Sequence, residues 1–89
     1  MKAVKGFVLF EPVGEYVLLP AGEGMGARRT AVLMNEVSAL IWRRLERGAT
    51  RQELLDAILA EYAVDAETAG RDLDGLLHKL KALGLMEES

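Results

Sequence analysis

The stretch TAVLMNEVSALIW, residues 30–42, contains the point at which the chain changes from one kind of secondary structure to another. Its first five residues are mostly apolar and favour a pleated sheet, so they predict a β-strand. Asn35 is a residue type that favours the N-cap of a helix. Val37, Ile41 and Leu45 then follow at helical spacing. A strand and a helix are therefore predicted to meet at Asn35.

Upstream of this junction, short apolar runs are interrupted by glycine and proline. Residues 6–11 and 16–21 predict two further strands, separated by a turn at 12–15 and followed by a loop at 22–29. The alternation of polar and apolar residues is poor, because both faces of the strands are apolar. We therefore expect the sheet to be covered on both sides, or on one side by something outside this chain.

Downstream of the junction, the pattern predicts three helices with short connections. The first ends at Gly48, and the sequence TRQE at 50–53 forms a capping box for the second. Asp65 caps the third helix, whose apolar stripe ends near Gly84 in a Schellman-type stop. The order βββααα indicates an α+β fold, with a three-stranded antiparallel sheet followed by three helices in a winged-helix-like arrangement.

Length and composition restrict the function. The 89 residues are enough for a single domain spanning 1–89, and half of them are hydrophobic. The formal charge of −3 argues against a nucleic-acid partner, and the absence of cysteine fits a cytoplasmic location. No run reaches the roughly 20 apolar residues of a membrane span, and residues 1–15 lack the layout of a signal peptide.

No set of residues predicts catalysis, a metal site or a cofactor. His78, the only histidine, lies opposite the apolar stripe of the third helix, one turn after Asp74, and is interpreted as a solvated side chain. The two serines, Ser38 and Ser89, have no credible catalytic partners. Trp42 is interpreted as a core residue, with a binding-site aromatic as the alternative. We therefore expect a protein that is not an enzyme.

Arginines gather around the third strand and the first two helices in this acidic chain. We favour the interpretation that these arginines form a solvated face balanced by nearby glutamates. The alternative is that they contact an acidic partner segment. A winged-helix DNA-binding regulator is the second candidate function. Its recognition helix, at 51–62, would carry Arg51 against several acids, which matches phosphate poorly. The arginines concerned are Arg28, Arg29, Arg43, Arg44, Arg47 and Arg51.

Taken in order, several segments resemble the PqqD family, whose members are also called RiPP precursor recognition elements. The resemblance rests on GFVLFEPVGEYVLLPAGE, on TAVLMNEVSALIW, and on LERGATRQELLDAILAEYAVDAETAGRDLDGLLHKLKALGLME, which together cover nearly the whole chain. It implies a domain that binds the leader segment of a ribosomally made precursor peptide and presents it to a modifying enzyme, often a radical S-adenosylmethionine protein. The family also implies a monomer or a weak, domain-swapped homodimer.

The resemblance implies that the leader adds as an extra strand beside the third strand, in a groove walled by the third helix. The uncharged TAVLM segment fits an open sheet edge, and a central strand paired on both sides is the alternative. One flank of the third helix carries Asp72 and Leu76, and the other carries Gly70 and Asp74; we favour the first. Lasso-peptide members often have an aromatic pair in strand three that is absent here, so the pathway is left open. The expected peptide-binding residues are Arg28, Arg29, Thr30, Ala31, Val32, Leu33, Ala69, Asp72, Leu73, Leu76, Lys79 and Leu80.

Overall fold

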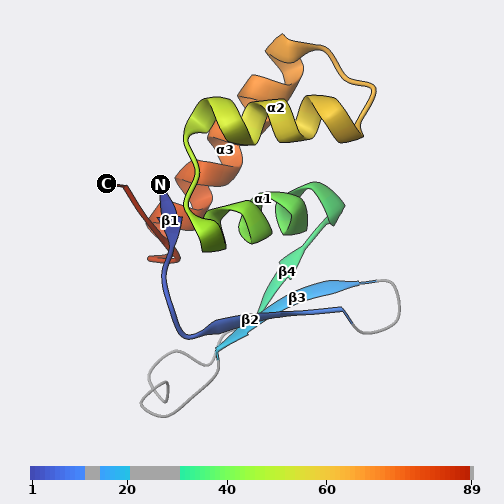
Figure 1. Cartoon of the computed structure of the whole chain (residues 1–89). Coiled ribbons are helices and arrows are strands. Elements are labelled where there is room, and N and C mark those ends of the chain that lie inside the picture. The colour runs from blue at the N-terminus through green and yellow to red at the C-terminus, as the bar shows by residue number, and fades with distance from the viewer. Residues whose placement is uncertain (12–14, 21–30, 89) are drawn as a thin grey trace.

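The predicted three-stranded antiparallel sheet is present. The computed structural model describes residues 1–11, 15–20 and 31–88, so the turn and loop expected at 12–15 and 22–29 lie almost entirely outside the described residues. The strands run in the order β2-β3-β4 (Figure 1). They are β2 (Phe7–Phe10), β3 (Tyr16–Pro20) and β4 (Val32–Met34).

The three predicted helices are also present, and each begins directly after the residue expected to cap it. They are α1 (Glu36–Arg47), α2 (Arg51–Glu61) and α3 (Ala66–Ala82). The Asn35 side chain accepts a hydrogen bond from the backbone N–H of Ser38 at 2.8 Å. Thr50 and Glu53 form both hydrogen bonds of the capping box, and Asp65 caps α3. These local hydrogen bonds satisfy N–H groups that a helix leaves unpaired at its start.

The end of α3 is a Schellman motif, as predicted. The backbone N–H of Leu85 donates to the carbonyl of Leu80 at 2.8 Å, and that of Gly84 donates to the carbonyl of Lys81 at 3.0 Å. Gly84 has a φ of 72°, which a residue with a side chain rarely adopts. The motif turns the chain back so that Leu85 enters the core.

A second, two-stranded sheet joins the ends of the chain. β1 (Lys2–Ala3) pairs antiparallel with β5 (Met86–Glu87), so the two termini lie side by side (Figure 1). The prediction of three strands missed this pair. Two-residue strands are too short to show a periodic pattern, and their pairing joins opposite ends of the sequence.

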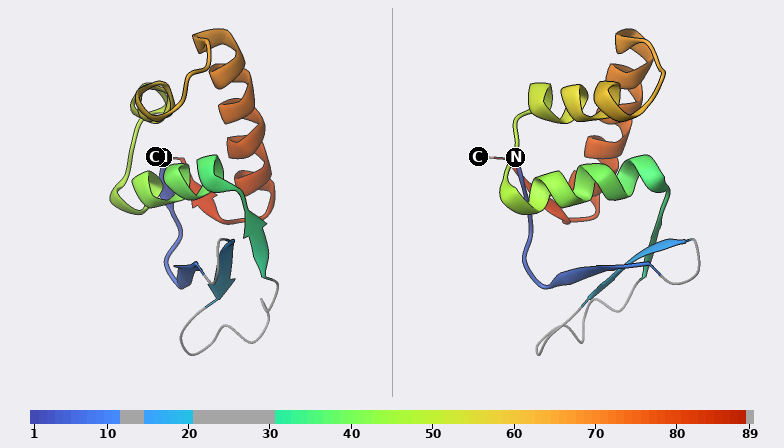
Figure 2. Two further views of the ribbon diagram at one scale, coloured as in Figure 1. Left: turned by 90° about the vertical axis from the view of Figure 1, so that its right-hand side faces the viewer. Right: turned by 45° about the vertical axis from the view of Figure 1, so that its right-hand side comes forward.

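All three helices lie on one side of the three-stranded sheet (Figure 2). The core between the layers contains fully buried side chains from the sheet and from every helix. Trp42 of α1 is completely buried and packs edge-on against Phe7 of β2, with ring centroids 6.4 Å apart. The interpretation of Trp42 as a core residue is therefore correct. The fully buried side chains are Leu18, Ile41, Trp42, Leu45, Leu54, Leu73 and Leu80.

A two-point ion pair connects α2 to α3. The Arg51 guanidinium donates to both carboxylate oxygens of Asp74, at 2.7 and 2.9 Å, and approaches the carbonyl of Gly70 at 3.4 Å. This hydrogen bond and the charge of Arg51 hold the pKa of Asp74 below its ordinary value. The pKa of Glu53 is lowered by its capping hydrogen bonds with Thr50.

These lowered pKa values predict a loss of stability in acid. A carboxyl group whose pKa is lower in the folded state stabilises the fold above its unfolded pKa and loses that contribution as the pH falls. We expect the melting temperature to fall between about pH 5 and pH 3. Asp74→Asn and Arg51→Gln should each make this fall shallower, measured by thermal circular dichroism. Unchanged acid profiles in both variants would contradict the prediction.

Candidate functional site

β4 has one open edge within the part of the chain that the structure describes. It pairs with β3 through Tyr16↔Met34, Val17↔Leu33 and Leu18↔Val32, and no described strand pairs with its other side. This places the third predicted strand at the edge, rather than in the centre, of the described sheet. An open edge presents backbone N–H and C=O groups that an added strand can pair with.

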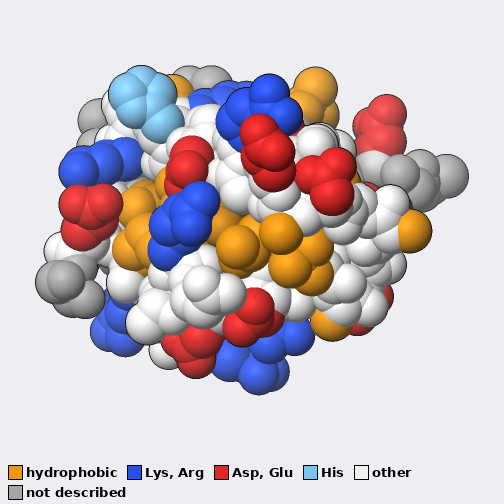
Figure 3. Space-filling model, turned by 90° about the horizontal axis from the view of Figure 1, so that it is seen from above, with side chains coloured by type: hydrophobic (Ala, Val, Ile, Leu, Met, Phe, Trp, Pro, Cys, Tyr) orange, Lys and Arg blue, Asp and Glu red, His pale blue; other side chains and the backbone are white. Residues whose placement is uncertain are grey.

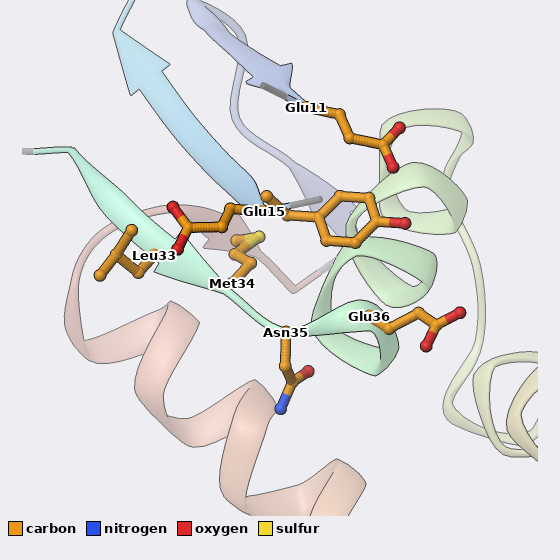
Figure 4. Close-up of a pocket in the computed structure, with 7 residues that line it drawn as sticks. Glu11, Glu15, Leu33, Met34, Asn35 and Glu36 are labelled. Atoms are coloured by element: carbon orange, nitrogen blue, oxygen red, sulfur yellow. The ribbon is translucent and has the colours of Figure 1, made fainter. Parts of the chain in front are cut away.

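Helix α3 lies on the β4 side of the molecule (Figure 2), and it passes close to the end of β4 (Figure 4). One flank of α3 already makes contacts within the chain: Asp74 binds Arg51, and Lys81 pairs with Glu88 at 2.9 Å. On the other flank, Asp72 is exposed and Leu76 is partly buried against the core. The flank with Asp72 and Leu76 is the one that we favoured for the groove.

The structure divides the expected peptide-binding residues into three groups. Ala31, Leu33, Asp72 and Lys79 are exposed, and Val32 and Leu76 are partly buried. Ala69, Leu73 and Leu80 belong to the hydrophobic core, because the apolar stripe that identifies them is the face by which α3 packs. These three side chains are therefore buried inside the domain. Arg28, Arg29 and Thr30 lie outside the described residues.

An open hollow of about 450 Å³ lies where β4 passes into α1 (Figure 4). Leu33 and Met34 supply apolar surface, and three carboxylates surround the hollow. This concentration of negative charge favours a cationic group over an anionic one at this end of β4. The lining residues are Glu11, Glu15, Tyr16, Leu33, Met34, Asn35 and Glu36.

Tyr16 connects the hollow to α1. A hydrogen bond to Glu11, together with burial and the charges of Glu11 and Glu36, raises the pKa of the Tyr16 phenol. The Arg43 guanidinium lies 5.6 Å from the centre of the same ring, at cation–π distance. One of the positive charges on α1 is thus engaged within the chain.

Sequence reasoning missed this hollow. Its acids come from segments on either side of the first predicted turn and from the start of α1. No periodic pattern links these positions, since they come together only when β3 pairs with β4. The signal available in the sequence was weak: Glu11 and Glu15 flank a predicted turn, and Glu36 follows a predicted N-cap.

The helical side of the molecule shows charges of both signs around hydrophobic side chains (Figure 3). One hollow of about 420 Å³ there, between α2 and α3, is lined by Arg51 and Arg71 but also by Glu67 and Asp74. A surface that binds nucleic acid would instead present a continuous basic patch to the phosphates. His78, also exposed on this side, has no metal-binding group around it within the described residues.

No helix in the described part of the chain has the length and hydrophobicity needed to cross a membrane. The three-stranded sheet with three helices on one side, and with an open edge beside α3, defines a small winged-helix-like domain. Within that class, the family model "Coenzyme PQQ synthesis protein D (PqqD)" matches residues 8–86. The chain belongs to the PqqD family.

Two solved structures are similar over nearly their full length. One, described as TbiB1 in complex with the TbiA(beta) leader peptide, is 36% identical with a TM-score of 0.77, covering 100% of this chain and 98% of that one. The other, a lasso peptide synthetase B1 complexed with the leader peptide, is 25% identical with a TM-score of 0.74, covering 94% and 93%. No curated protein matches the chain.

Proposed function

We propose that this chain binds the leader segment of a ribosomally synthesised precursor peptide and presents it to a modifying enzyme. The observation that carries the proposal is the open edge of β4 beside α3. Both similar structures are described as complexes with leader peptides, which supports the same role here.

The proposed mode of binding is β-strand addition. An extended leader pairs its backbone with β4, and alternate side chains fill the groove between β4 and α3. The favoured flank of α3 supplies Asp72 and Leu76, because the opposite flank is engaged by α2 and by the C-terminal segment. The peptide-binding set remains the one expected from the sequence, with Ala69, Leu73 and Leu80 supporting the groove from the core.

The chain supplies binding and orientation, and the chemistry belongs to its partner. We propose that this partner is a cytoplasmic enzyme of the precursor's pathway, with a radical S-adenosylmethionine protein as the candidate that the family resemblance implies. The similarity to a lasso peptide synthetase B1 adds the lasso pathway to the candidates. The DNA-binding alternative is not retained, since Arg51 of α2 is held by Asp74 and the helical side carries charges of both signs.

The test is a titration with a synthetic leader peptide of the cognate precursor. Amide chemical shifts should change mainly in residues 28–34 and 69–80. Asp72→Asn should weaken leader binding about two- to tenfold, as expected for one lost charged contact. Asp74→Asn is the matched control, because it makes the same change on the opposite flank of α3 and should leave the leader affinity unchanged.

Each of these measurements has an outcome that would contradict the proposed site. Unchanged leader affinity in Asp72→Asn would remove that residue from the site. Weaker binding in Asp74→Asn alone would move the groove to the other flank. Shifts confined to α2 would overturn strand addition to β4.

A further inference from the structure

Helix α3, which forms one wall of the proposed groove, contains two glycines in its interior. Gly70 and Gly75 both lie between the ends of the helix at Ala66 and Ala82. Glycine is a poor helix former, because its backbone loses more conformational freedom on folding than that of any other residue. Each of the two glycines therefore lowers the stability of α3, and each calls for a reason in packing or in function.

Packing explains Gly70. This residue is buried, and a Cβ atom added to it would lie 3.2 Å from the Nη2 atom of Arg51. The same guanidinium approaches the Gly70 carbonyl oxygen at 3.4 Å and donates to the Asp74 carboxylate. The missing side chain at Gly70 thus leaves room for the ion pair that connects α2 to α3.

Packing within the described part of the chain does not explain Gly75. The residue is exposed. Apart from its own helical backbone and its two chain neighbours, no described atom lies within 4 Å of the place that a Cβ atom would take. Gly75 therefore lies on the solvent side of α3, between the buried Leu73 and Leu77. Alanine would fit there and would favour the helix more strongly.

The two halves of α3 on either side of Gly75 are held by different parts of the molecule. Figure 2 shows α3 running from α2 at one end toward the three-stranded sheet at the other. The first half is connected to α2 by the ion pair between Asp74 and Arg51. The second half is connected to the C-terminal segment by the ion pair between Lys81 and Glu88. Gly75 lies between these two attachments.

The two groove residues of the favoured flank also lie on opposite sides of Gly75. Asp72 belongs to the half that is attached to α2, and Leu76 belongs to the half that is attached to the C-terminal segment. A helix bends most easily where its solvent-side backbone hydrogen bonds can lengthen, and glycine leaves these groups uncovered. A change of angle at Gly75 therefore moves Asp72 relative to Leu76 and to β4.

We propose that Gly75 is a hinge in the groove wall, and that leader binding bends α3 there so that Asp72 reaches the leader. The inference rests on the proposed function and adds to it a positioning residue, which itself makes no contact with the leader. A ligand shifts a conformational equilibrium only by its different affinity for the two states. A residue that favours the straight helix must therefore stabilise the free protein and weaken leader binding.

The test combines thermal melting of the full chain with titration by a synthetic leader peptide of the cognate precursor. Gly75→Ala raises the helix propensity at the hinge, and Gly75→Gln does so with a longer side chain. His78→Ala is the control, because it also raises the helix propensity at an exposed position of α3 but lies away from the favoured flank.

The hinge predicts opposite changes in stability and in leader affinity. Gly75→Ala should raise the melting temperature by about 4–8 °C and weaken leader binding about three- to fivefold. Gly75→Gln should match Gly75→Ala in leader affinity within about twofold. His78→Ala should also raise the melting temperature, but it should bind leader like the parent.

A double-mutant cycle tests whether the hinge positions Asp72. The loss of leader affinity caused by Asp72→Asn should be smaller in combination with Gly75→Ala than in the parent, because the straight wall holds Asp72 away from the leader. In combination with His78→Ala, the loss caused by Asp72→Asn should equal the loss in the parent.

Three results would overturn the hinge. The first is a Gly75→Ala variant that is more stable than the parent and binds leader equally well. The second is a loss caused by Asp72→Asn that is the same with and without Gly75→Ala. The third is a Gly75→Gln variant that binds leader more than tenfold more weakly than Gly75→Ala, which would assign Gly75 to a direct contact. A parent that fails to bind leader would instead show that the proposed function is wrong.

Discussion

Replacing Trp42 with alanine is expected to remove about 3–5 kcal/mol of folding free energy. Trp42 is completely buried, and its ring packs edge-on against Phe7, so it connects α1 to the inner face of the sheet. A domain of this size has a total stability of about 4–13 kcal/mol. The alanine variant should therefore unfold at a much lower urea concentration, and it should bind leader weakly because the sheet that carries β4 loses its support.

The control for this variant is Trp42→Phe. The indole N–H of Trp42 has no hydrogen-bond partner among the described residues, so replacing the indole leaves no acceptor unpaired. Phenylalanine keeps an aromatic ring against Phe7 and should cost clearly less than alanine. Unfolding must be followed by circular dichroism, because Trp42 is the only tryptophan. An alanine variant with the urea midpoint of the parent would show that Trp42 does not support the core.

The start of each helix was predictable because its signals are local. Asn35, Thr50 and Asp65 each accept a hydrogen bond from a backbone N–H three residues later. The contacts that decide each cap therefore lie within one helical turn along the sequence. The Schellman end at Gly84 is local in the same sense.

Features that depend on distant parts of the chain were not predictable. The pairing of Lys2–Ala3 with Met86–Glu87 joins the two ends, and the acidic hollow brings Glu11 near Glu36. The edge position of β4 was expected from its uncharged sequence and from the family resemblance, but the central alternative stayed open because one sequence does not determine the order of strands. Local propensity predicts that a strand forms, but which strands are its neighbours depends on the tertiary packing.

The candidate site was predictable only in part, because the apolar stripe of α3 was used to predict both core residues and groove residues. Leu73 and Leu80 were expected in both the core and the groove, and the structure buries them almost completely. Helical periodicity identifies the face that packs inside, so it cannot by itself select residues for an exposed groove. The ion pair between Arg51 and Asp74 is more informative, because it engages the flank that was not favoured.

Proline substitution at the start of β4 is expected to weaken leader binding about tenfold at one of two neighbouring positions. Successive backbone N–H groups of a strand point to opposite edges. Of Ala31 and Val32, one therefore directs its N–H to the open edge and the other to β3. Ala31→Pro and Val32→Pro each remove one of these donors, because proline has no N–H. The variant that loses the donor to β3 should instead lower the urea midpoint.

Leader affinity and the urea midpoint, both measured on Ala31→Pro and Val32→Pro, separate peptide binding from folding. The edge variant should keep the stability of the parent and lose about 1.4 kcal/mol of leader binding, the size expected when one backbone hydrogen bond is lost. Ala31→Ser keeps the N–H and should bind leader like the parent. If neither proline variant weakens leader binding beyond what its lost stability explains, the leader does not pair with the backbone of β4. Binding would then depend on the side chains of α3.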